Sequence, residues 1–305
     1  STDESWMILE EYRKCDSRIQ IHIRPNHLTK GGNSCRNYGL NMSKGSLVLF
    51  LDSDDVLADY CLGQRIQAVI ENRDLDFWAF PTALFEKKSE EAQFYWNLDN
   101  STESDLSRFL RMDALWQTSG CLYRRDFLIK LNGLSLERKF WQDYELHLKA
   151  LLSAKSYKKF FKLPPDVFIR NGDLSSLSRS TPFTADLVIL LDRINFLENI
   201  FNFAKNKNRT LTDSELYSLF SFQYYLIIQL WLKHGKFFLF IRRWLIYSDR
   251  YLLPLGSQII GVYEALILKI ESKFNLILKD KINKMDNFPD YFILEKVKIG
   301  TYPLL

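Results

Sequence analysis

A short apolar run that ends in three carboxylates constrains this chain more than any other feature. Leu47–Leu51 is continuously apolar and is followed at once by Asp52, Ser53, Asp54 and Asp55. A run of this kind predicts a strand covered on both faces of a parallel sheet. Ligands of such sheets bind beyond the carboxyl ends of the strands, and hard oxygen ligands favour Mg²⁺ or Mn²⁺ over Zn²⁺. The aspartates therefore stand where a divalent ion and a charged ligand could be held.

A second explanation of these aspartates is purely structural. A helix is predicted from about Asp59 to Glu71, and Asp54, Asp55 or Asp59 could cap its first turn. Its apolar residues recur on one side; they are Leu62, Ile66, Val69 and Ile70.

Strands and helices alternate through the first part of the chain, which indicates an α/β fold with a mostly parallel sheet flanked by helices. A capping box of Ser1 and Glu4 predicts an opening helix through Tyr12. The predicted strands are Arg18–Ile23, Leu47–Leu51 and Asp76–Phe80, and a helix is predicted around Cys35–Met42. Leu115–Arg124 predicts a short strand pair, followed by a helix over Asp126–Leu131 that Asn132 and Gly133 end.

Another carboxylate, Asp143, lies in the first turn of a predicted helix. Tyr144, Leu148, Leu151 and Leu152 recur at helical spacing after it. An acid at a helix start is stabilised by the helix dipole, so the local pattern alone favours a structural role for Asp143.

From about residue 185 onward the chain changes to long apolar and aromatic helical stretches, which predicts two regions, 1–184 and 185–305. Thr212 and Glu215 form a capping box before one of these helices. The stretch Leu216–Leu232 carries no charge, but its Ser and Gln side chains favour a buried or amphipathic helix over a membrane span.

Basic and aromatic residues mix along 233–250. Lys233, Lys236, Arg242, Arg243 and Arg250 flank aromatic segments, a mixture suited to peripheral contact with an anionic membrane. The alternative is an ordinary helical subdomain packed against the sheet, and the sequence leaves both open.

Composition limits the class of partner. The chain has 305 residues, of which 47% are hydrophobic, and a net charge of +4. This charge is too small to imply nucleic acid, whereas phosphorylated small molecules fit. The sequence has no Gly-rich dinucleotide or P-loop signature and no C-x-x-C spacing. It does not begin with a secretion-type leader, so a cytoplasmic protein is predicted, at the inner face of the cell membrane if the C-terminal helices bind lipid.

The residues around the first carboxylates resemble the inverting family 2 glycosyltransferases, which have the fold called GT-A. Arg36, Asn37 and Gly39, then a strand, then an Asp-x-Asp pattern follow the family's A-R-N-x-G order, with Cys35 in place of the alanine. The resemblance implies that Arg36, Asn37, Asp52 and Asp54 bind a nucleotide-diphosphate-sugar, a UDP-sugar above all. It also implies Mn²⁺ or Mg²⁺ on Asp54 and Asp52.

The segment Trp141–Lys149 resembles a second family motif, E-D-x-D/E-L-x-L-R, with Gln142 in place of glutamate. This resemblance places Asp143 at the catalytic position, where a carboxylate acts as general base. It also implies an acceptor site at Thr118, Ser119 and Gly120, and at Arg170, which matches the arginine of a later family segment whose histidine this chain lacks.

The resemblance implies transfer of one sugar, with inversion, to a saccharide or lipid-linked saccharide during surface polysaccharide synthesis. Two alternatives remain open: a noncatalytic binding or scaffolding module, and a sugar-phosphate nucleotidyltransferase. Ser1–Ser5 resembles the end of a family segment, so we also expect a strand–helix–strand unit ahead of Ser1.

Overall fold

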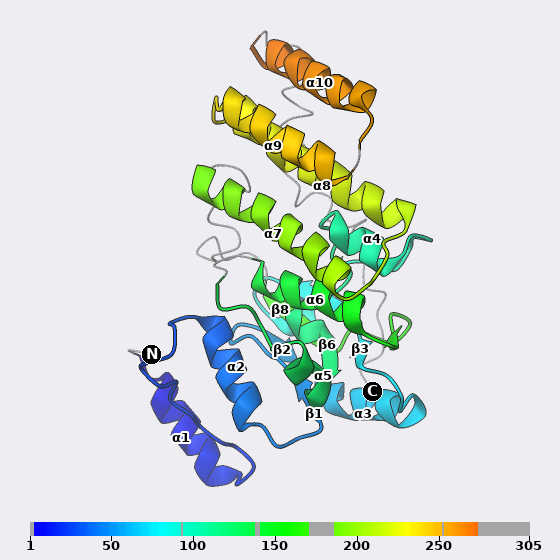
Figure 1. Ribbon diagram of the computed structural model, residues 1–305. Helices are drawn as coiled ribbons and strands as arrows, with labels where there is room; N and C mark the ends of the chain where they lie inside the picture. The colour runs from blue at the N-terminus through cyan, green and yellow to red at the C-terminus, as the bar shows by residue number, and fades with distance from the viewer. Residues whose placement is uncertain (1–2, 93, 138–140, 171–185, 252, 274–305) are drawn as a thin grey trace.

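The computed structural model describes residues 3–92, 94–137, 141–170, 186–251 and 253–273. Within them, two four-stranded sheets lie among helices, and long helices stack away from the sheets at one end (Figure 1). The predicted α/β class and the helical C-terminal region are confirmed. The strands are β1 (Leu47–Leu49), β2 (Val56–Leu57), β3 (Phe77–Ala79), β4 (Thr82–Phe85), β5 (Phe94–Tyr95), β6 (Cys121–Arg124), β7 (Tyr157–Lys159) and β8 (Val167–Arg170). The helices are α1 (Ser5–Cys15), α2 (Gly32–Met42), α3 (Cys61–Glu71), α4 (Asp105–Leu110), α5 (Arg125–Lys130), α6 (Gln142–Ser153), α7 (Leu187–Asn206), α8 (Asp213–Leu232), α9 (Phe237–Arg250) and α10 (Leu255–Lys273), with 3₁₀ turns η1 (Ser89–Glu91) and η2 (Thr118–Gly120).

Both sheets are mixed, so the predicted mostly parallel arrangement is wrong. The first sheet has the order β1-β6-β3-β7, and the second has the order β2-β8-β4-β5. Only the pairs β3–β7 and β4–β8 are parallel among the described strands. β1 is an edge strand that pairs antiparallel with β6, with Val48 opposite Tyr123. The predicted strand pair at 115–124 is instead η2 followed by the single strand β6.

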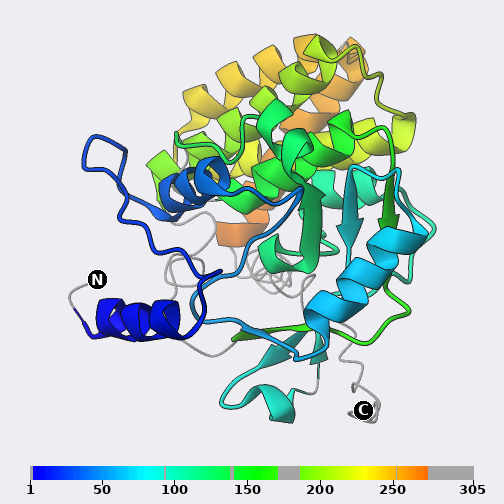
Figure 2. The ribbon, with the colours of Figure 1, turned by 90° about the horizontal axis from the view of Figure 1, so that it is seen from below.

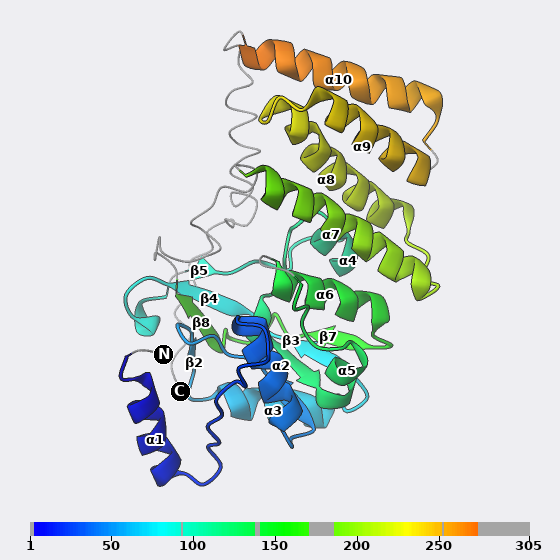
Figure 3. The same cartoon turned by 60° about the vertical axis from the view of Figure 1, so that its left-hand side comes forward.

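Alternate residues of β3 and its continuation pack on opposite layers, as the two-residue period of a strand requires. Phe77 and Ala79 join the main core with α4 and α6, whereas Trp78 and Phe80 pack with Ala68 of α3. Helices therefore cover both faces of the first sheet (Figure 3).

The N-terminal segment differs from the prediction in two ways. α1 begins only at Ser5, its N-cap residue is Glu4, and no side chain caps it, so the predicted capping box is not formed; Ser1 lies outside the described residues. Residues 18–23 form no strand, and Ile23 is 71% exposed. Alternation of polar and apolar residues is not enough for a strand, because the backbone also needs a neighbouring strand to bond to, and no described strand lies beside this segment.

Helix α3 turns its apolar stripe outward. Leu62, Ile66 and Ile70 are about half exposed or more, while the helix buries Cys61 and Arg65. The reason is a buried ion pair: Arg65 Nη2 lies 2.7 Å from Asp166 Oδ1, and the two side chains are almost fully buried. The ion pair therefore lies on the buried side of α3, and the apolar residues lie on the exposed side.

The C-terminal helices α7 to α10 form a stack that packs on the sheet layers through α4 and α6 (Figures 1 and 3). The predicted capping box of Thr212 and Glu215 is confirmed at the start of α8, and much of α8 is buried. Among the described helices, none combines the length and apolarity needed to cross a membrane. The predicted boundary at 184/185 falls in a segment outside the described residues.

Candidate active site

The first carboxylates follow β1 in a tight turn. The backbone N–H of Asp55 donates to the carbonyl of Asp52 at 3.1 Å. Asp52 forms an ion pair with Arg36, which reaches across from α2, and Asp54 is exposed. None of the aspartates caps α3, whose N-cap residue is Tyr60 without a capping side chain. The capping explanation is therefore wrong, and these side chains remain available for other roles.

Asp55 is held more tightly than its neighbours. It accepts a hydrogen bond from the Ser119 hydroxyl at 3.1 Å and one from the backbone N–H of Arg170 at 3.4 Å. Burial raises the pKa of the Asp55 carboxyl to about 6, and the charge of Asp52 raises it as well, while the hydrogen bond from Ser119 lowers it. The sequence placed Asp55 with Asp52 and Asp54 near a possible divalent ion, but it did not reveal these partners, because they come from distant parts of the chain.

Asp143 lies in the first turn of α6, as predicted. The residue before the helix, Trp141, is the N-cap and has a left-handed backbone with φ of 59°. The Thr118 hydroxyl donates to Asp143 Oδ2 at 3.3 Å. Asp143 is half-buried, so the carboxylate keeps a solvent-facing surface.

The 3₁₀ turn η2 is hydrogen-bonded to both Asp143 and Asp55. Its consecutive residues Thr118 and Ser119 contact Asp143 and Asp55 respectively. Adjacent residues lie about 3.8 Å apart along the chain, so the two acids approach the same turn. Asp143 and Asp55 are thus both held at η2, and a single site shared by Asp143 and the Asp52–Asp55 turn stays a prediction.

The Arg65 side chain of α3 is hydrogen-bonded to the backbone of η2. Its Nη1 donates to the Ser119 carbonyl at 3.0 Å, while its other nitrogens bind both oxygens of Asp166, at 2.8 and 2.7 Å. The Gln117 side chain accepts from the Ser119 N–H at 2.9 Å. Gly120 completes the fit, since an added Cβ would lie 3.1 Å from Thr82 Cγ2. Arg65 and Asp166 are thus supporting residues that the sequence did not reveal.

The residues predicted to bind the acceptor differ in burial: Thr118, Ser119 and Gly120 lie in the buried turn η2, whereas Arg170 is exposed at the end of β8. Thr118, Ser119 and Gly120 are buried, so in this conformation their hydroxyls and backbone support the carboxylates; their acceptor role stays a prediction. Arg170 ends β8, and its guanidinium carbon lies 4.7 Å from the centre of the Phe85 ring. Its backbone contact with Asp55 places β8 beside the first carboxylates.

Arg36 and Asn37 are neighbours on α2, but their side chains contact different parts of the fold. Arg36 reaches Asp52, whereas Asn37 is bound to the turn after α5: its amide donates to the Leu134 carbonyl at 2.8 Å and accepts from the Leu134 N–H at 2.9 Å. Gly133 leaves room for this contact, because an added Cβ would lie 2.4 Å from Asn37 Oδ1. The structure therefore gives Asn37 a positioning task, and its nucleotide-sugar contact stays a prediction.

The described residues supply only part of the ligand set that a divalent cation needs. In the described ranges, no three acidic, histidine or cysteine side chains cluster as ligands for a metal ion. Asp54 and Asp52 nevertheless offer the hard carboxylate oxygens that Mg²⁺ and Mn²⁺ prefer, and such ions commonly use one or two carboxylates together with substrate phosphates and water. The residues present fit a cation that a bound diphosphate would complete.

Comparison with known proteins finds similarity to one kind of enzyme. Residues 1–131 match the model of the family described as glycosyl transferase family 2. An uncharacterized glycosyltransferase of Haemophilus influenzae is 26% identical over 131 residues, which are 43% of this chain and 44% of that protein. The uncharacterized glycosyltransferase EpsJ of Bacillus subtilis is 28% identical over 167 residues, which are 51% of this chain and 46% of EpsJ. The matched region thus spans less than half of either relative.

The fold has a counterpart among solved structures. The crystal structure of S. aureus TarS 1-349 in complex with UDP-GlcNAc aligns with a TM-score of 0.59 and 15% identity, covering 90% of this chain and 81% of that one. At this identity the likeness shows the fold alone, and the fold is GT-A-like. The family model and the curated relatives agree with each other: residues 1–131 of this chain match the model of glycosyl transferase family 2, and the similar relatives are described as glycosyltransferases.

Proposed function

We propose that this chain transfers a single sugar from a nucleotide-diphosphate-sugar, a UDP-sugar above all, to a saccharide or lipid-linked saccharide, with inversion at the anomeric carbon. One observation carries the proposal: η2 contacts Asp143 through Thr118 and Asp55 through Ser119. A base and an anionic donor site beside each other are what a direct displacement requires. The TarS structure in complex with UDP-GlcNAc supports the choice of donor class.

Asp143 has the role of general base in this proposal. The acceptor hydroxyl attacks the anomeric carbon, its proton passes to the Asp143 carboxylate, and the bond from the anomeric carbon to the diphosphate oxygen breaks. Thr118 orients the carboxylate by its hydrogen bond. Asp54 and Asp52 would hold Mn²⁺ or Mg²⁺, which supplies a Lewis acid for the charge on the leaving diphosphate.

Replacing Asp143 tests the mechanism. Asp143→Asn keeps the size of the side chain and removes its basicity, so we expect transfer to fall about 10²-fold or more while UDP binding is retained. Release of UDP from UDP-sugars with acceptor glycans and Mn²⁺ measures the rate, and NMR of the product anomer tests inversion. Asp126→Asn, in the exposed first turn of α5, is the matched control. Turnover of Asp143→Asn at the wild-type rate would remove Asp143 from this role.

A noncatalytic binding or scaffolding module is the second candidate, and it stays open because the described residues contain no cluster of three side chains able to hold a metal ion. Calorimetry with UDP and Mn²⁺ separates the two, because an enzyme of this kind binds both together. A chain that binds neither, and releases no UDP from any donor, fits the scaffold.

We further propose a cytoplasmic protein that contacts the inner face of the cell membrane, in support of a role in surface polysaccharide synthesis. An unbroken apolar face of α10 supports this contact; its exposed residues are Leu255, Ile259, Ile260, Tyr263, Leu266, Ile267 and Ile270. Two of the five basic residues along 233–250 form ion pairs within the stack instead. Arg243 Nη1 lies 3.5 Å from Glu198 Oε1, and Arg250 Nη1 lies 3.7 Å from Glu198 Oε2.

Liposome flotation tests the membrane contact. We expect the chain to float with vesicles that contain anionic lipid, and Ile259→Asp together with Ile270→Asp to abolish flotation, because buried charge on an apolar face is costly. Leu62→Asp, on the exposed side of α3, is the control. Wild-type protein that stays in the pellet fraction at low salt would exclude the contact.

A further inference from the structure

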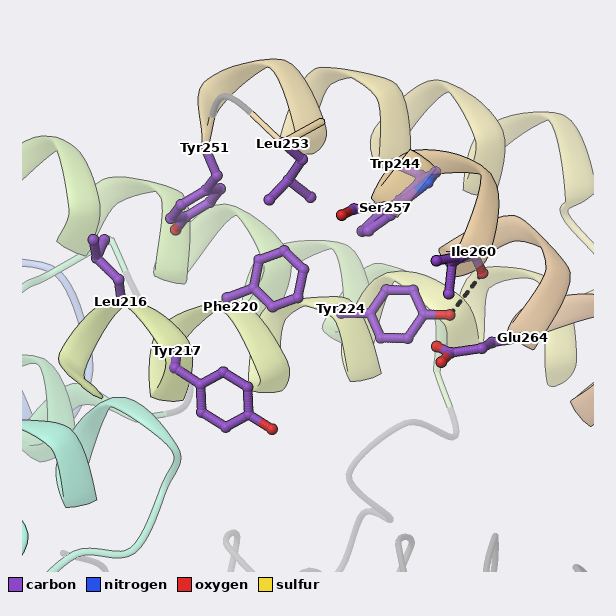
Figure 4. A pocket seen from close by; sticks show the side chains of 11 residues that line it. Leu216, Tyr217, Phe220, Tyr224, Trp244, Tyr251, Leu253, Ser257, Ile260 and Glu264 are labelled. Atoms are coloured by element: carbon purple, nitrogen blue, oxygen red, sulfur yellow. Dashed lines mark hydrogen bonds between the residues drawn. The ribbon is translucent and has the colours of Figure 1, made fainter. Parts of the chain in front are cut away.

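A cavity of about 480 Å³ opens in the C-terminal stack, away from the carboxylates. It lies between α8, α9 and α10, and Figure 4 shows aromatic side chains along its length. Its lining includes Phe220 and Tyr224 of α8, Trp244 of α9, and Ser257 and Glu264 of α10. In Figure 4 the carboxylate of Glu264 faces the hydroxyl of Tyr224 at one end.

Specific contacts keep this cavity from closing. The Trp244 indole N–H donates to the Gln258 carbonyl at 2.9 Å, and the Tyr224 hydroxyl donates to the Gly261 carbonyl at 2.7 Å. Only glycine fits at position 261 without a shift of the neighbouring ring, because a Cβ there would lie 2.4 Å from Trp244 Cζ2. These hydrogen bonds fix the distance of α10 from α8 and α9 near Gly261. If α10 moved closer to Phe220, the hydrogen bonds would break. The open space is therefore a consequence of how the three helices are joined.

The chemistry of the lining selects a class of ligand. Among the described residues, the lining contains no lysine, arginine or histidine, and it carries the Glu264 carboxylate, so anions such as a nucleotide or a phosphate are disfavoured. An acyl chain would strip water from Glu264 without replacing its hydrogen bonds. Aromatic faces are electron-rich and attract polarised C–H groups, while carboxylates and hydroxyls bind hydroxyl groups. A neutral sugar presents both kinds of group.

The cavity also has a suitable length. Its α8 residues run from Leu216 to Tyr224, which spans about 12 Å at the rise of an α-helix. This is room for a short segment of glycan rather than for one small ion. Phe220 and Tyr251 lie with ring centres 6.1 Å apart, and Tyr224 and Trp244 lie 5.0 Å apart, so rings follow one another along the lining.

We propose that this cavity is a saccharide-binding site separate from the transfer site, which holds a neutral segment of an acceptor glycan. The choice of ligand rests on the proposed function, since a polymer-elongating or polymer-decorating transferase must retain a chain longer than the sugar it modifies. The cavity itself does not depend on catalysis, so its binding can be measured without a donor.

The experiment uses the full chain and a panel of neutral malto-, cello- and chito-oligosaccharides. Binding is followed by Trp fluorescence and by saturation-transfer NMR, without nucleotide. Glu264→Ala removes the carboxylate and Ser257→Trp fills the opening; both positions are exposed, so folding should be retained. Val188→Ala is the matched control, since Val188 is exposed on α7 of the same helical stack and does not line the cavity.

We expect at least one glycan to bind. Glu264→Ala should weaken its binding about tenfold, as loss of one good hydrogen bond implies. Ser257→Trp should weaken it at least as much, because it fills the opening, while Val188→Ala leaves the affinity unchanged. The proposal is overturned if no glycan of the panel binds, if binding survives both variants, or if choline binds the cavity and the sugars do not. UDP titrated into the same samples reports on the transfer site. Loss of UDP binding with intact glycan binding would count against the proposed function alone.

Discussion

The pKa of His147, which lies one helical turn after the candidate base Asp143, is set by burial. Its ring is 1% exposed on α6, its Nδ1 lies 2.8 Å from the Tyr123 hydroxyl, and the rings of Phe109 and Trp116 lie around it. Burial lowers the pKa of His147 to about 4, although the charge of Asp143 acts in the opposite direction. The imidazole is therefore neutral in the folded protein at neutral pH, and it serves as part of the core under Asp143.

This burial makes the stability of the fold depend on pH. The unfolded chain binds the proton with the ordinary His pKa of 6.5, and the folded chain with a pKa of about 4. The stabilisation is complete above pH 6.5 and is lost as the pH falls toward 4, about 3 kcal/mol in all. His147→Gln keeps a hydrogen-bonding group for Tyr123 and should reduce this loss, as measured by urea unfolding at pH 7 and pH 5. Equal pH dependence of both proteins would contradict the assignment.

At the scale of elements, the site depends on how α3, η2 and β8 are joined. Arg65 of α3 binds Asp166, which precedes β8, and also binds the Ser119 carbonyl in η2. The Phe80 ring lies under the guanidinium, 4.6 Å from its carbon. Three elements that are distant in sequence therefore meet at one buried cation, and the orientation of Thr118 and Ser119 toward the carboxylates follows from this contact.

Two variants separate the stability of this junction from its positioning effect. Arg65→Met leaves the Asp166 charge buried without its partner and should lower the free energy of unfolding by about 3–5 kcal/mol. Arg65→Met with Asp166→Leu removes both charges and should recover most of that loss. Transfer should stay impaired in the double variant, because the Ser119 carbonyl has lost its donor. Urea unfolding and UDP release measure the two effects; full activity in the stable double variant would show that Arg65 has no positioning effect.

At the scale of the whole molecule, one apolar core runs from the first sheet through α4 and α6 into the C-terminal helices. Trp141, the residue before α6, lies with its ring centre 5.5 Å from Phe196 of α7 and 6.1 Å from Phe222 of α8. The Arg193 guanidinium carbon lies 4.7 Å from the same ring. The helical stack thus packs directly against the turn that presents Asp143.

We therefore expect the sheet layers and the helical stack to unfold together. Phe196 is fully buried, so Phe196→Ala should lower the free energy of unfolding by about 3–5 kcal/mol and should reduce transfer. Circular dichroism and Trp fluorescence should show a single, coincident transition in urea for the wild-type and variant proteins. Val188→Ala, at a 75% exposed position of the same helix, is the control. Two separate transitions would show that the regions are independent.

Local patterns in the sequence predicted several elements and the main acids correctly. The strand before Asp52, the helix that begins beside Asp143, and the capping box of Thr212 and Glu215 all follow from interactions within a few residues. Such interactions are encoded by spacing alone. The strand predicted at 18–23 was wrong because a strand also needs a partner, which spacing does not specify.

The identities of the two acids and the helical or extended state around them are thus properties of the linear chain. Their convergence is not: Ser119 lies 64 positions from Asp55, and Arg65 lies 101 positions from Asp166. The outward turn of the apolar stripe on α3 and the elevated pKa of Asp55 have the same origin. Each arises from burial and from partners that folding brings together, because charge pairing and loss of water depend on distance in space and not on order in the sequence.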